Sequence, residues 1–446
     1  MRSYLTSYRC TQCGKEFETD KLHYLCDDCS RDYVPGMPLL GVLEAMFDYA
    51  TIAKAWKEKP DPLLFSAVAP EFYPPLPVGA TPFFKVERLS ECLFGDWIPA
   101  CAGMTNGEKG MTNESSPSPQ HSNTPELQHS STPTLQHSRT PAPQHPLTPN
   151  LWIKNEALNP SGSYKDRASQ LVVADAVQKG IHEIVAASTG NAASSLACIA
   201  ASVGKKAVIF APESAPPAKL IQIQVHGAEL HKVNGTYDDA FKAALNYSAM
   251  HECLCRNTGY HPLTVDGKKS AGLELFIQND FTVPDWIVIP VGDGVIITGI
   301  YKAFVDLQRA GIISELPKLL CVQAESSDAI TSYWESGKYC DAANPATIAD
   351  SISVKTPALA HWAVEAIHKT KGKAIRVSDT EIQQAQLNLA RLAGVFAEPS
   401  SAATLAGVEK AWQNGWITKT AKSSPESRIV LLITGHGLKD PAAVKL

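Results

Sequence analysis

The feature that most constrains the fold is an alternation, after residue 150, of short apolar runs with helical stretches. Uninterrupted apolar runs of this kind are typical of strands buried on both faces of a parallel sheet, with helices crossing over those faces. The expected strands are 184–187, 207–210, 286–290, 319–324 and 429–434. The expected helices are 164–178, 192–203, 217–225, 237–251 and 271–278. The predicted fold class is therefore α/β.

The first 100 residues carry a weaker pattern. Residues 1–35 are polar and rich in cysteine, with too little apolar content for a core of their own. From about residue 37 the composition is that of a globular domain. Here we expect a helix over 39–54, a proline-rich loop over 74–82 and a short strand over 83–86.

Residues 101–150 interrupt the globular pattern. They consist mainly of Ser, Thr, Pro, His, Gln and Asn, and imperfect repeats begin at Gln120, Gln128 and Gln136. Such a composition cannot bury enough apolar surface to offset the entropy lost when the backbone is ordered. We predict a disordered insertion into a surface connection. The alternative is a histidine-rich metal tract, but the many prolines do not suit a compact set of ligands.

Charge and composition exclude two classes of partner. The chain has 40 basic and 45 acidic side chains and a formal net charge of −5, without the dense basic surface that binds nucleic acid. No apolar run approaches the roughly 20 residues that span a membrane, and the N-terminus lacks a secretory signal. Eleven cysteines with one tight cluster indicate thiols and metal ligands in a reducing compartment. We therefore predict a cytoplasmic protein.

The tight cluster consists of two Cys-x-x-Cys motifs, Cys10 with Cys13 and Cys26 with Cys29, separated by twelve residues. Each motif presents two thiolates from one turn, and the pair completes the tetrahedral sulfur site that zinc occupies in small modules without a core. Gly14 suits the backbone turn after the first motif. A redox motif and incidental thiols are the alternatives. We predict a structural zinc ion.

A lysine lies at the start of one predicted helix, in the segment Asn159-Pro-Ser-Gly-Ser-Tyr-Lys165-Asp-Arg167. The positive potential of a helix N-terminus disfavours an ammonium group and so favours the neutral amine that imine formation requires. Asp166 and Arg167 could fix the start of the helix. An ordinary helix start with an exposed lysine explains this motif equally well when it is taken alone.

Three further loops favour the chemical interpretation, because each follows an apolar run. The Ser188–Asn191 turn opens a helix, where hydroxyl and N–H groups form an anion site suited to a substrate carboxylate. The glycine-rich loop 292–299 could cradle a phosphate with backbone amides, provided that the side chain of Asp293 turns back into the loop; a tight strand-to-helix turn is the alternative. Thr434 ends the last strand, where its hydroxyl can meet a neutral ring nitrogen.

Taken in order, these motifs resemble those of the threonine synthase family of fold-type-II pyridoxal-phosphate enzymes. The resemblance covers roughly residues 36–100 and 151–446, and some relatives also begin with a short cysteine-rich segment. The segments that carry it are Thr81-Pro-Phe, Asn155-Glu-Ala-Leu-Asn-Pro-Ser-Gly-Ser-Tyr-Lys-Asp-Arg, Ala187-Ser-Thr-Gly-Asn, Asp266-Gly-Lys-Lys-Ser, Glu398-Pro-Ser-Ser-Ala-Ala and, most particular to the family, Thr434-Gly-His-Gly-Leu-Lys-Asp-Pro.

The resemblance implies a role for each matched residue. Lys165 would hold pyridoxal 5'-phosphate as an imine and then move protons as a general acid and base. Asn191 would bind the phenolic oxygen of the cofactor, and Thr434 its pyridine nitrogen, which leaves the ring unprotonated. The cofactor phosphate would be bound by Gly292, Asp293, Gly294, Val295 and Ile296. The substrate would be bound by Ser188, Thr189 and Gly190 at its carboxylate and by Asn257 and Thr258 at its phosphate.

Three features depart from the family pattern. The phosphate loop usually reads Gly-Asn-x-Gly-Asn, whereas here Gly292 is followed by Asp-Gly-Val-Ile. The lysine motif has Tyr164 where Phe is commoner and Ala168 where Gly is commoner. Thr264 takes the approximate place of an arginine that holds the substrate phosphate, and the loss of a bidentate guanidinium weakens phosphate binding. Candidates to compensate for the missing charge are His261, Lys268 and Lys269.

The predicted architecture has two doubly wound α/β domains with the cofactor between them, at the carboxyl ends of parallel strands. A four-cysteine zinc knuckle over 1–35 precedes a larger catalytic domain, which comprises 36–100, 151–180 and 266–446. The disordered insertion over 101–150 interrupts it, and 181–265 form the smaller domain. The resemblance also implies a homodimer that acts on a small amino-acid substrate.

The reaction implied by the resemblance is a lyase reaction of threonine biosynthesis, in which O-phospho-L-homoserine and water give L-threonine and phosphate. One alternative keeps the cofactor and changes the substrate, as in β-replacement on phosphoserine by cysteate synthases or in the dehydration of serine or threonine. A binding protein with a degenerate site is the non-enzymatic alternative. The presence of Lys165, Asn191 and Thr434 argues against it.

Overall fold

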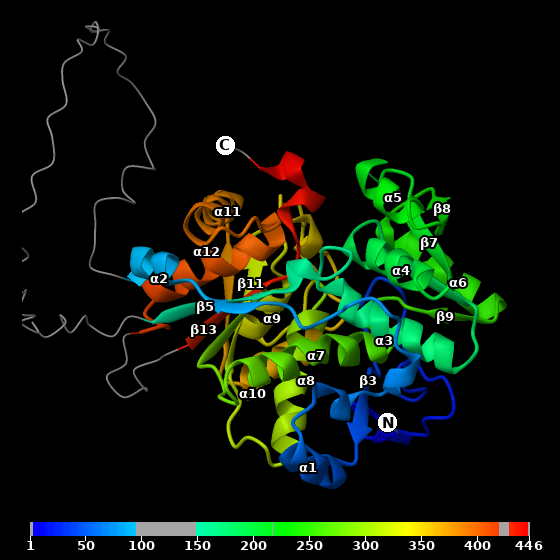
Figure 1. Ribbon diagram of the computed structural model, residues 1–446. Helices are drawn as coiled ribbons and strands as arrows, with labels where there is room; N and C mark the ends of the chain where they lie inside the picture. The colour runs from blue at the N-terminus through cyan, green and yellow to red at the C-terminus, as the bar shows by residue number, and fades with distance from the viewer. Residues whose placement is uncertain (1–2, 95–148, 216, 419–427, 445–446) are drawn as a thin grey trace, which may run out of the picture.

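The computed structural model describes residues 3–94, 149–215, 217–418 and 428–444 (Figure 1). The predicted disordered insertion over 101–150 lies outside the described residues except for Pro149 and Asn150. Of these two, Pro149 is buried and Asn150 already begins a strand.

The described strands form three sheets. The six-stranded sheet has the order β12 (Lys373–Val377), β11 (Lys318–Ala324), β10 (Trp286–Pro290), β13 (Arg428–Ile433), β5 (Asn150–Asn155), β4 (Phe83–Lys85). Its strands are parallel except that β4 runs antiparallel to β5. The four-stranded sheet is parallel, with the order β8 (Glu229–Val233), β7 (Lys206–Pro212), β6 (Glu183–Ala187), β9 (Cys253–Cys255). The third sheet is antiparallel, with the order β2 (Glu16–Phe17), β1 (Leu5–Cys10), β3 (Leu43–Phe47).

Helices cover both faces of the six-stranded and four-stranded sheets, which confirms the α/β fold class. They are α1 (Tyr49–Glu58), α2 (Glu87–Phe94), α3 (Lys165–Gln178), α4 (Asn191–Ala201), α5 (Pro217–Gln224), α6 (Tyr237–Met250), α7 (Leu263–Gln278), α8 (Val295–Arg309), α9 (Ala329–Ser336), α10 (Ala360–Lys369), α11 (Asp379–Ala393) and α12 (Pro399–Gln413). In Figure 1 the six-stranded sheet and its helices α2, α11 and α12 lie to the left, and α4, α5 and α6 of the smaller sheet lie to the right.

The apolar strands bury both of their faces because successive side chains point to opposite sides of a sheet. In β10, Ile287 and Ile289 belong to the core that also contains side chains of α7, α8 and α10. Trp286 and Val288 belong to the core formed with α2, α11 and α12. In the smaller sheet, Val185 of β6 packs with α6, whereas its neighbours pack toward α4 and α5.

The helix predicted over 39–54 is wrong. Residues 43–47 form strand β3, which pairs with β1 in the N-terminal sheet, and α1 begins only at Tyr49. The alternating side chains Leu43, Ala45 and Phe47 are buried in the core, so pairing with β1 outweighs the helical preference of this segment. The side chain of Asp48 then accepts the N–H of Thr51 at 3.0 Å and caps α1.

Helix α7 begins at Leu263, eight residues before the predicted start at 271. Two glycines made this segment a poor helix by propensity. Both have a packing reason: a Cβ atom on Gly267 would collide with the backbone of Arg167 in α3, and one on Gly272 would lie 2.6 Å from the Cβ of Ala303 in α8. Close packing between helices thus explains glycines that look like helix breakers in the sequence.

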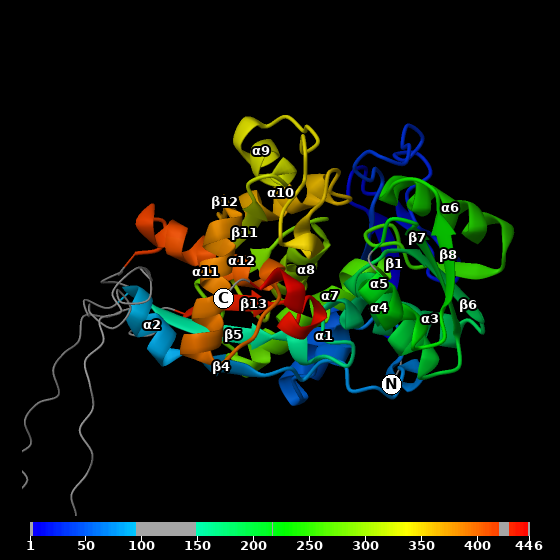
Figure 2. The ribbon, with the colours of Figure 1, turned by 90° about the horizontal axis from the view of Figure 1, so that it is seen from above.

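The strand order brings several strand ends to one place. Strands β10, β13 and β5 are parallel neighbours, so their carboxyl ends meet at the same edge of the larger sheet. They lead into the glycine-rich loop, Thr434 and the lysine segment. In the view of Figure 2 the C-terminal segment after β13, drawn in red, lies between the larger and the smaller sheet.

No helix in the described parts of the chain is both long enough and apolar enough to cross a membrane.

Candidate active site

Lys165 is the first residue of α3, and the residue before it anchors the start of this helix. The backbone N–H of Tyr164 donates to the carbonyl of Thr434 at 2.8 Å, and its fully buried hydroxyl donates to the carbonyl of Lys268 at 2.7 Å. The Nζ atom of Lys165 lies 3.6 Å from Oδ2 of Asp293, and its side chain is 14% exposed. The alternative of an ordinary, exposed lysine is therefore wrong.

A pocket between α3, the β10–α8 loop and the end of β13 brings together most of the predicted cofactor residues. Those that line it are Lys165, Asn191, Gly292, Asp293, Gly294, Ile296 and Thr434. The exception is Val295, whose side chain packs in the core with Leu39 and Val42. The predicted amine, amide, hydroxyl and glycine loop thus surround one space, although they lie far apart in the sequence.

The glycine loop has the shape that the sequence motif predicts. Gly294 caps α8 in the left-handed conformation with φ of +83°, which disfavours any residue with a side chain. A Cβ on Gly292 would lie 2.9 Å from Cα of Ile352. Oδ1 of Asp293 accepts the N–H of Val295 at 3.0 Å, so its side chain does turn back into the loop.

The Ser188–Asn191 turn lies at the start of α4, beside the same space. Thr189, Gly190 and Asn191 line a second pocket next to the first. The Oγ atom of Ser188 accepts the N–H of Gly190 at 3.3 Å, within the turn. Asn257, predicted to bind substrate, also supports this turn, because its Oδ1 accepts the N–H of Ala187 at 2.8 Å.

Glu398 is a residue of the site to which the sequence assigned no role. It is buried, lines both pockets, and its Oε2 accepts from Nδ2 of Asn191 at 3.0 Å. Its Oε1 lies 3.5 Å from the hydroxyl of Thr434, and burial raises the pKa of this carboxyl group. The segment Glu398-Pro-Ser-Ser was visible as a family motif, but only the fold brings its carboxyl group between Asn191 and Thr434.

A buried arginine, Arg256, lies near the position where the sequence lacks the family's arginine. Thr264, at that position, donates its hydroxyl to the carbonyl of His261 at 2.7 Å and accepts the N–H of Gly259 at 3.0 Å. Arg256 lies just before the Asn257–Thr258 pair and is fully buried, and its Nη1 donates to Oγ1 of Thr258 at 2.6 Å. Its Nη2 has no hydrogen-bond partner among the described residues. Burial lowers the pKa of Arg256 to about 10, against the attraction of Asp293.

Lys268 is a second buried basic side chain with an unsatisfied donor. Its Nζ makes no hydrogen bond within the described parts of the chain, and burial followed by the charge of Lys165 lowers its pKa. Lys269, another candidate to compensate for the missing arginine, is instead paired with Asp266 and Asp306. We call Lys165, Arg256, Lys268 and Asp293 the site cluster, because each of the other three is an electrostatic neighbour of Asp293.

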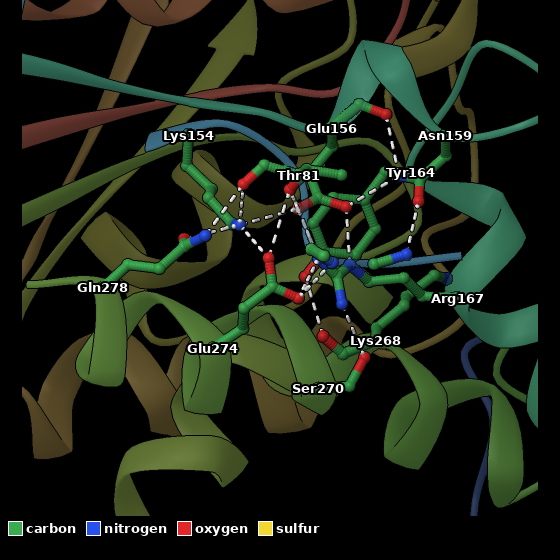
Figure 3. Close-up of polar contacts among 12 residues, drawn as sticks. Thr81, Lys154, Glu156, Asn159, Tyr164, Arg167, Lys268, Ser270, Glu274 and Gln278 are labelled. Atoms are coloured by element: carbon green, nitrogen blue, oxygen red, sulfur yellow. Dashed lines mark hydrogen bonds and ion pairs between the residues drawn. The ribbon is translucent and has the colours of Figure 1, made fainter. Parts of the chain in front are cut away.

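A second group of buried charges lies beside the site cluster and is fully paired (Figure 3). We call it the Arg167 network; its members are Thr81, Lys154, Glu156, Arg167 and Glu274. The guanidinium of Arg167 donates to both carboxylate oxygens of Glu156, at 2.5 and 2.8 Å, and to Glu274 at 3.0 Å. The amine of Lys154 donates to the carbonyl of Thr81 at 2.7 Å and also to Glu274.

The Arg167 network fixes the first turn of α3 to β5 and α7, as the sequence suggested for Arg167. Burial raises the pKa of Glu156, but Arg167 and Lys154 outweigh this effect and hold the pKa to about 2. Asp166 fixes the same turn from the other side, because its carboxylate accepts the N–H of Ser161 at 2.6 Å. The backbone that carries the Lys165 side chain is therefore held in place from both sides.

The four cysteines lie together in the N-terminal module. Their sulfur atoms are all within 4.8 Å of one another, and those of Cys13 and Cys26 are 3.8 Å apart. Zinc–sulfur bonds of about 2.3 Å in a tetrahedron place two sulfurs roughly 3.8 Å apart. Gly14 has φ of +75° and donates its N–H to the carbonyl of Cys10 at 3.0 Å, which is the predicted turn.

The first pocket fits the cofactor that the sequence resemblance implies. An aldehyde needs an amine, which Lys165 supplies at the pocket wall. A phosphate needs a backbone cradle, and Gly292 and Gly294 bring a stretch of loop backbone without side chains to the pocket wall. Buried cations at Arg256 and Lys268 supply positive charge nearby.

Comparison with known proteins agrees with this chemistry. The family model for pyridoxal-phosphate dependent enzymes matches residues 126–435. Threonine synthase of Methanosarcina acetivorans is 31% identical over 445 residues, which cover 98% of this chain and 93% of that protein. Threonine synthase of Methanocaldococcus jannaschii is 37% identical over 296 residues, which cover 66% of this chain and 71% of that protein.

The fold is also that of a solved structure. Maize serine racemase superimposes with a TM-score of 0.55 at 23% identity, over 65% of this chain and 84% of that protein.

Proposed function

The chain belongs to the threonine synthase family of pyridoxal-phosphate-dependent enzymes, and from this membership we propose that it converts O-phospho-L-homoserine and water into L-threonine and phosphate. It is a pyridoxal-phosphate-dependent lyase. The observation that carries the choice of a phosphorylated substrate is that two buried basic side chains, Arg256 and Lys268, each keep a donor nitrogen without a hydrogen-bond partner in the described structure.

Unpaired donors on buried cations are costly, since each has lost its hydration without gaining a hydrogen bond. An anionic ligand offsets that cost by accepting from both groups. Asn257 adds a third donor, because its Nδ2 is also buried and has no partner in the described structure. We propose that the substrate phosphate is held by Arg256, Asn257 and Lys268, in place of the arginine that is absent at position 264.

The remaining residues have roles in proton transfer and orientation. When bound, pyridoxal 5'-phosphate would supply an aldehyde for the substrate's amino group and a ring that accepts the electron pair released at the α-carbon of the substrate. Lys165 would take the α-proton at Nζ and pass it on before it takes a β-proton, and phosphate would then leave from the γ-carbon. Protons would return to the γ-carbon and, after the hydroxide of water adds at the β-carbon, to the α-carbon, while the remaining proton of water leaves with the phosphate. Ser188, Thr189 and Gly190 would hold the substrate carboxylate at the start of α4. Thr434 and Asn191, both in contact with Glu398, would orient the ring.

Phosphate release from a panel of substrates tests this function. The holoenzyme should release phosphate from O-phospho-L-homoserine and leave phosphoserine and threonine largely unreacted. Turnover of phosphoserine with an added nucleophile would point to β-replacement, and ammonia from threonine would point to dehydration. Either result in the absence of phosphohomoserine turnover would contradict the proposal.

Borohydride reduction tests the role of Lys165. Reduction should remove the visible absorbance of the bound cofactor and leave a stable label on Lys165. Lys165→Ala should lose the label and at least about 10³-fold in kcat, because general acid–base catalysis alone contributes 10²–10⁴-fold. The control is Lys57→Ala, which removes an exposed lysine of α1 far from the pocket. Normal turnover by Lys165→Ala would refute the mechanism.

We also propose that Cys10, Cys13, Cys26 and Cys29 bind one structural zinc ion, supported by their four converging sulfur atoms. All four ligands come from the protein, which leaves no coordination position for a substrate. Elemental analysis of protein purified without chelator should find one zinc per chain, and none in a Cys10→Ser/Cys13→Ser variant. Metal-free wild-type protein would contradict this. Such thiolate sites persist in a reducing compartment, which supports the prediction of a cytoplasmic enzyme.

The predicted homodimer is carried forward as a proposal. Light scattering should give twice the chain mass of 48.1 kDa.

A further inference from the structure

The glycine loop between β10 and α8 carries an acidic residue, Asp293, where the family pattern has an asparagine. Asp293 lies between the two glycines of the loop, and its backbone carbonyl accepts the N–H of Leu359 at 2.9 Å. Gly292 packs against Ile352, and Gly294 requires a positive φ, so the backbone around Asp293 cannot shift freely. The loop therefore holds this carboxylate in a defined place.

The two carboxylate oxygens of Asp293 have different neighbours. Oδ1 accepts the N–H of Val295 at 3.0 Å, at the first turn of α8. Oδ2 lies 3.6 Å from Nζ of Lys165, and the two side chains are only 24% and 14% exposed. The bond to Val295 fixes the carboxylate, so its second oxygen stays next to the lysine nitrogen.

Asp293 is a permanent anion in the neutral pH range. Burial raises the pKa of its carboxyl group, but Lys165, Lys268, the N–H of Val295 and Arg256 together outweigh this effect and hold the pKa to about 2. Because the pKa is lowered, the group is ionised at every pH above that value. A negative charge therefore lies beside Lys165 in the neutral pH range.

Other charged groups face this pair from the surrounding elements. Lys268 of α7 is an electrostatic neighbour of both Lys165 and Asp293, and Arg256, between β9 and α7, is one of Asp293. Glu398, at the start of α12, lies within electrostatic reach of Lys165, and Tyr237 of α6 within reach of Asp293. Asp293 is the carboxylate within ion-pairing distance of Lys165 among the described residues.

We propose that Asp293 is the counter-ion of Lys165 and stabilises the protonated state of the lysine nitrogen between its two proton transfers. The inference rests on the proposed function, because it takes Lys165 as the residue that binds the cofactor and moves substrate protons. In each transfer the proton passes between a substrate carbon and Nζ of Lys165, and Asp293 remains a carboxylate. Its contribution is electrostatic and requires no further reactant.

Acylation of Lys165 in the full-length protein without cofactor tests this inference without reference to activity. Only a neutral amine reacts with an acyl ester, so loss of the counter-ion should speed the reaction. Asp293→Asn keeps the shape and the acceptor for Val295 but removes the charge. It should acylate about tenfold faster at Lys165 near neutral pH, since a change of one pKa unit alters the neutral fraction tenfold. Exposed Lys57 in the same digest is the internal reference.

The second readout is the visible absorption of the holoenzyme as a function of pH. The absorbance change that reports loss of the proton from the lysine nitrogen should move to lower pH in Asp293→Asn. Asp293→Glu retains the charge and should resemble the wild type more closely. The control Asp341→Asn removes an exposed carboxylate elsewhere and should change neither readout.

The outcomes separate this inference from the proposed function. If borohydride labels Lys165 but Asp293→Asn acylates and titrates like the wild type, the counter-ion proposal is wrong and the proposed function stands. If borohydride leaves Lys165 unlabelled, the proposed function itself fails. A faster acylation together with a shifted absorbance titration supports the counter-ion.

Discussion

Two groups of buried charge adjoin the first turn of α3, and they differ in whether their charges are satisfied. In the Arg167 network the guanidinium has Glu156, Glu274 and Ser270 as partners, and the Lys154 amine also has several. In the neighbouring site cluster, Arg256 and Lys268 each keep a donor without a partner in the described structure. The first arrangement holds elements together, whereas the second is incomplete until an anion binds.

This difference teaches how buried charge can be interpreted. A fully paired network loses stability when one member is removed, because its partner is left buried and uncompensated. A cluster with unsatisfied donors on buried basic groups responds differently. Removing one of these groups should not lower the stability of the free protein, and its effect should appear in ligand binding.

Arg167→Leu should destabilise the protein by about 3–5 kcal/mol, the usual cost of breaking a buried ion pair. The free energy of unfolding in urea measures it. The double variant Glu156→Leu/Arg167→Leu removes both charges and should lose less than the single variant. A loss of unfolding free energy below about 1 kcal/mol, as for an exposed ion pair, would show that the Arg167 network does not hold α3 to β5 and α7.

Acid should weaken the network through Glu156. Its pKa is about 2 in the folded protein against an ordinary value of 4.5, so its contribution is fully present above pH 4.5 and is lost as the pH falls toward 2. A shift of this size corresponds to about 3 kcal/mol of stability over that window. The unfolding free energy of Glu156→Gln, lower at neutral pH, should show a flatter dependence on pH in the same window. Equal slopes for both proteins would contradict the assignment.

Arg256→Met should reduce kcat/KM for O-phospho-L-homoserine by about 10²-fold, because a hydrogen bond to a charged group is worth about 1.5–3 kcal/mol. Its unfolding free energy without ligand should stay the same or rise, since a buried charge with an unsatisfied donor is removed. Arg256→Lys, which keeps the charge but not the planar fork, should recover part of the activity. A large loss of stability would instead place Arg256 with the paired network.

Inorganic phosphate should stabilise the holoenzyme by binding to the site cluster. At ten times its Kd the expected gain is about 1.4 kcal/mol, which thermal unfolding detects as a rise in Tm. Arg256→Met should lose this gain, and Arg167→Leu should keep it. Equal stabilisation by sulfate and phosphate is acceptable, but a gain that survives Arg256→Met would show that the anion binds elsewhere.

Local patterns predicted much of this molecule. The runs at 184–187, 286–290 and 319–324 lie in β6, β10 and β11, and Lys165 begins α3 as expected. These predictions worked because a buried parallel strand must be apolar on both faces, and because glycines and caps mark strand-to-helix turns. Leu43–Phe47 failed because its partner strand, β1, lies more than 30 residues away in the sequence.

The site could be predicted only in part. Lys165, Asn191, the glycine loop and Thr434 each carry a local motif, and all line one pocket. Arg256 and Glu398 were missed as contributors because a single arginine or glutamate has no signature of its own. The side chain of Val295 packs in the core with Leu39 and Val42, so a role for this residue at the cofactor phosphate would belong to its backbone.

The order of residues by itself determined the α/β class, the lysine at a helix start and the paired cysteine motifs, because periodicity, backbone preference and ligand spacing act over a few residues. The tertiary structure alone decided which buried charges are paired and which are left open. Arg167 meets Glu156 and Glu274, while Arg256 and Lys268 face Asp293 and Lys165. That choice depends on which strands become neighbours and how closely α3 packs on α7, and these contacts form between residues far apart in the chain.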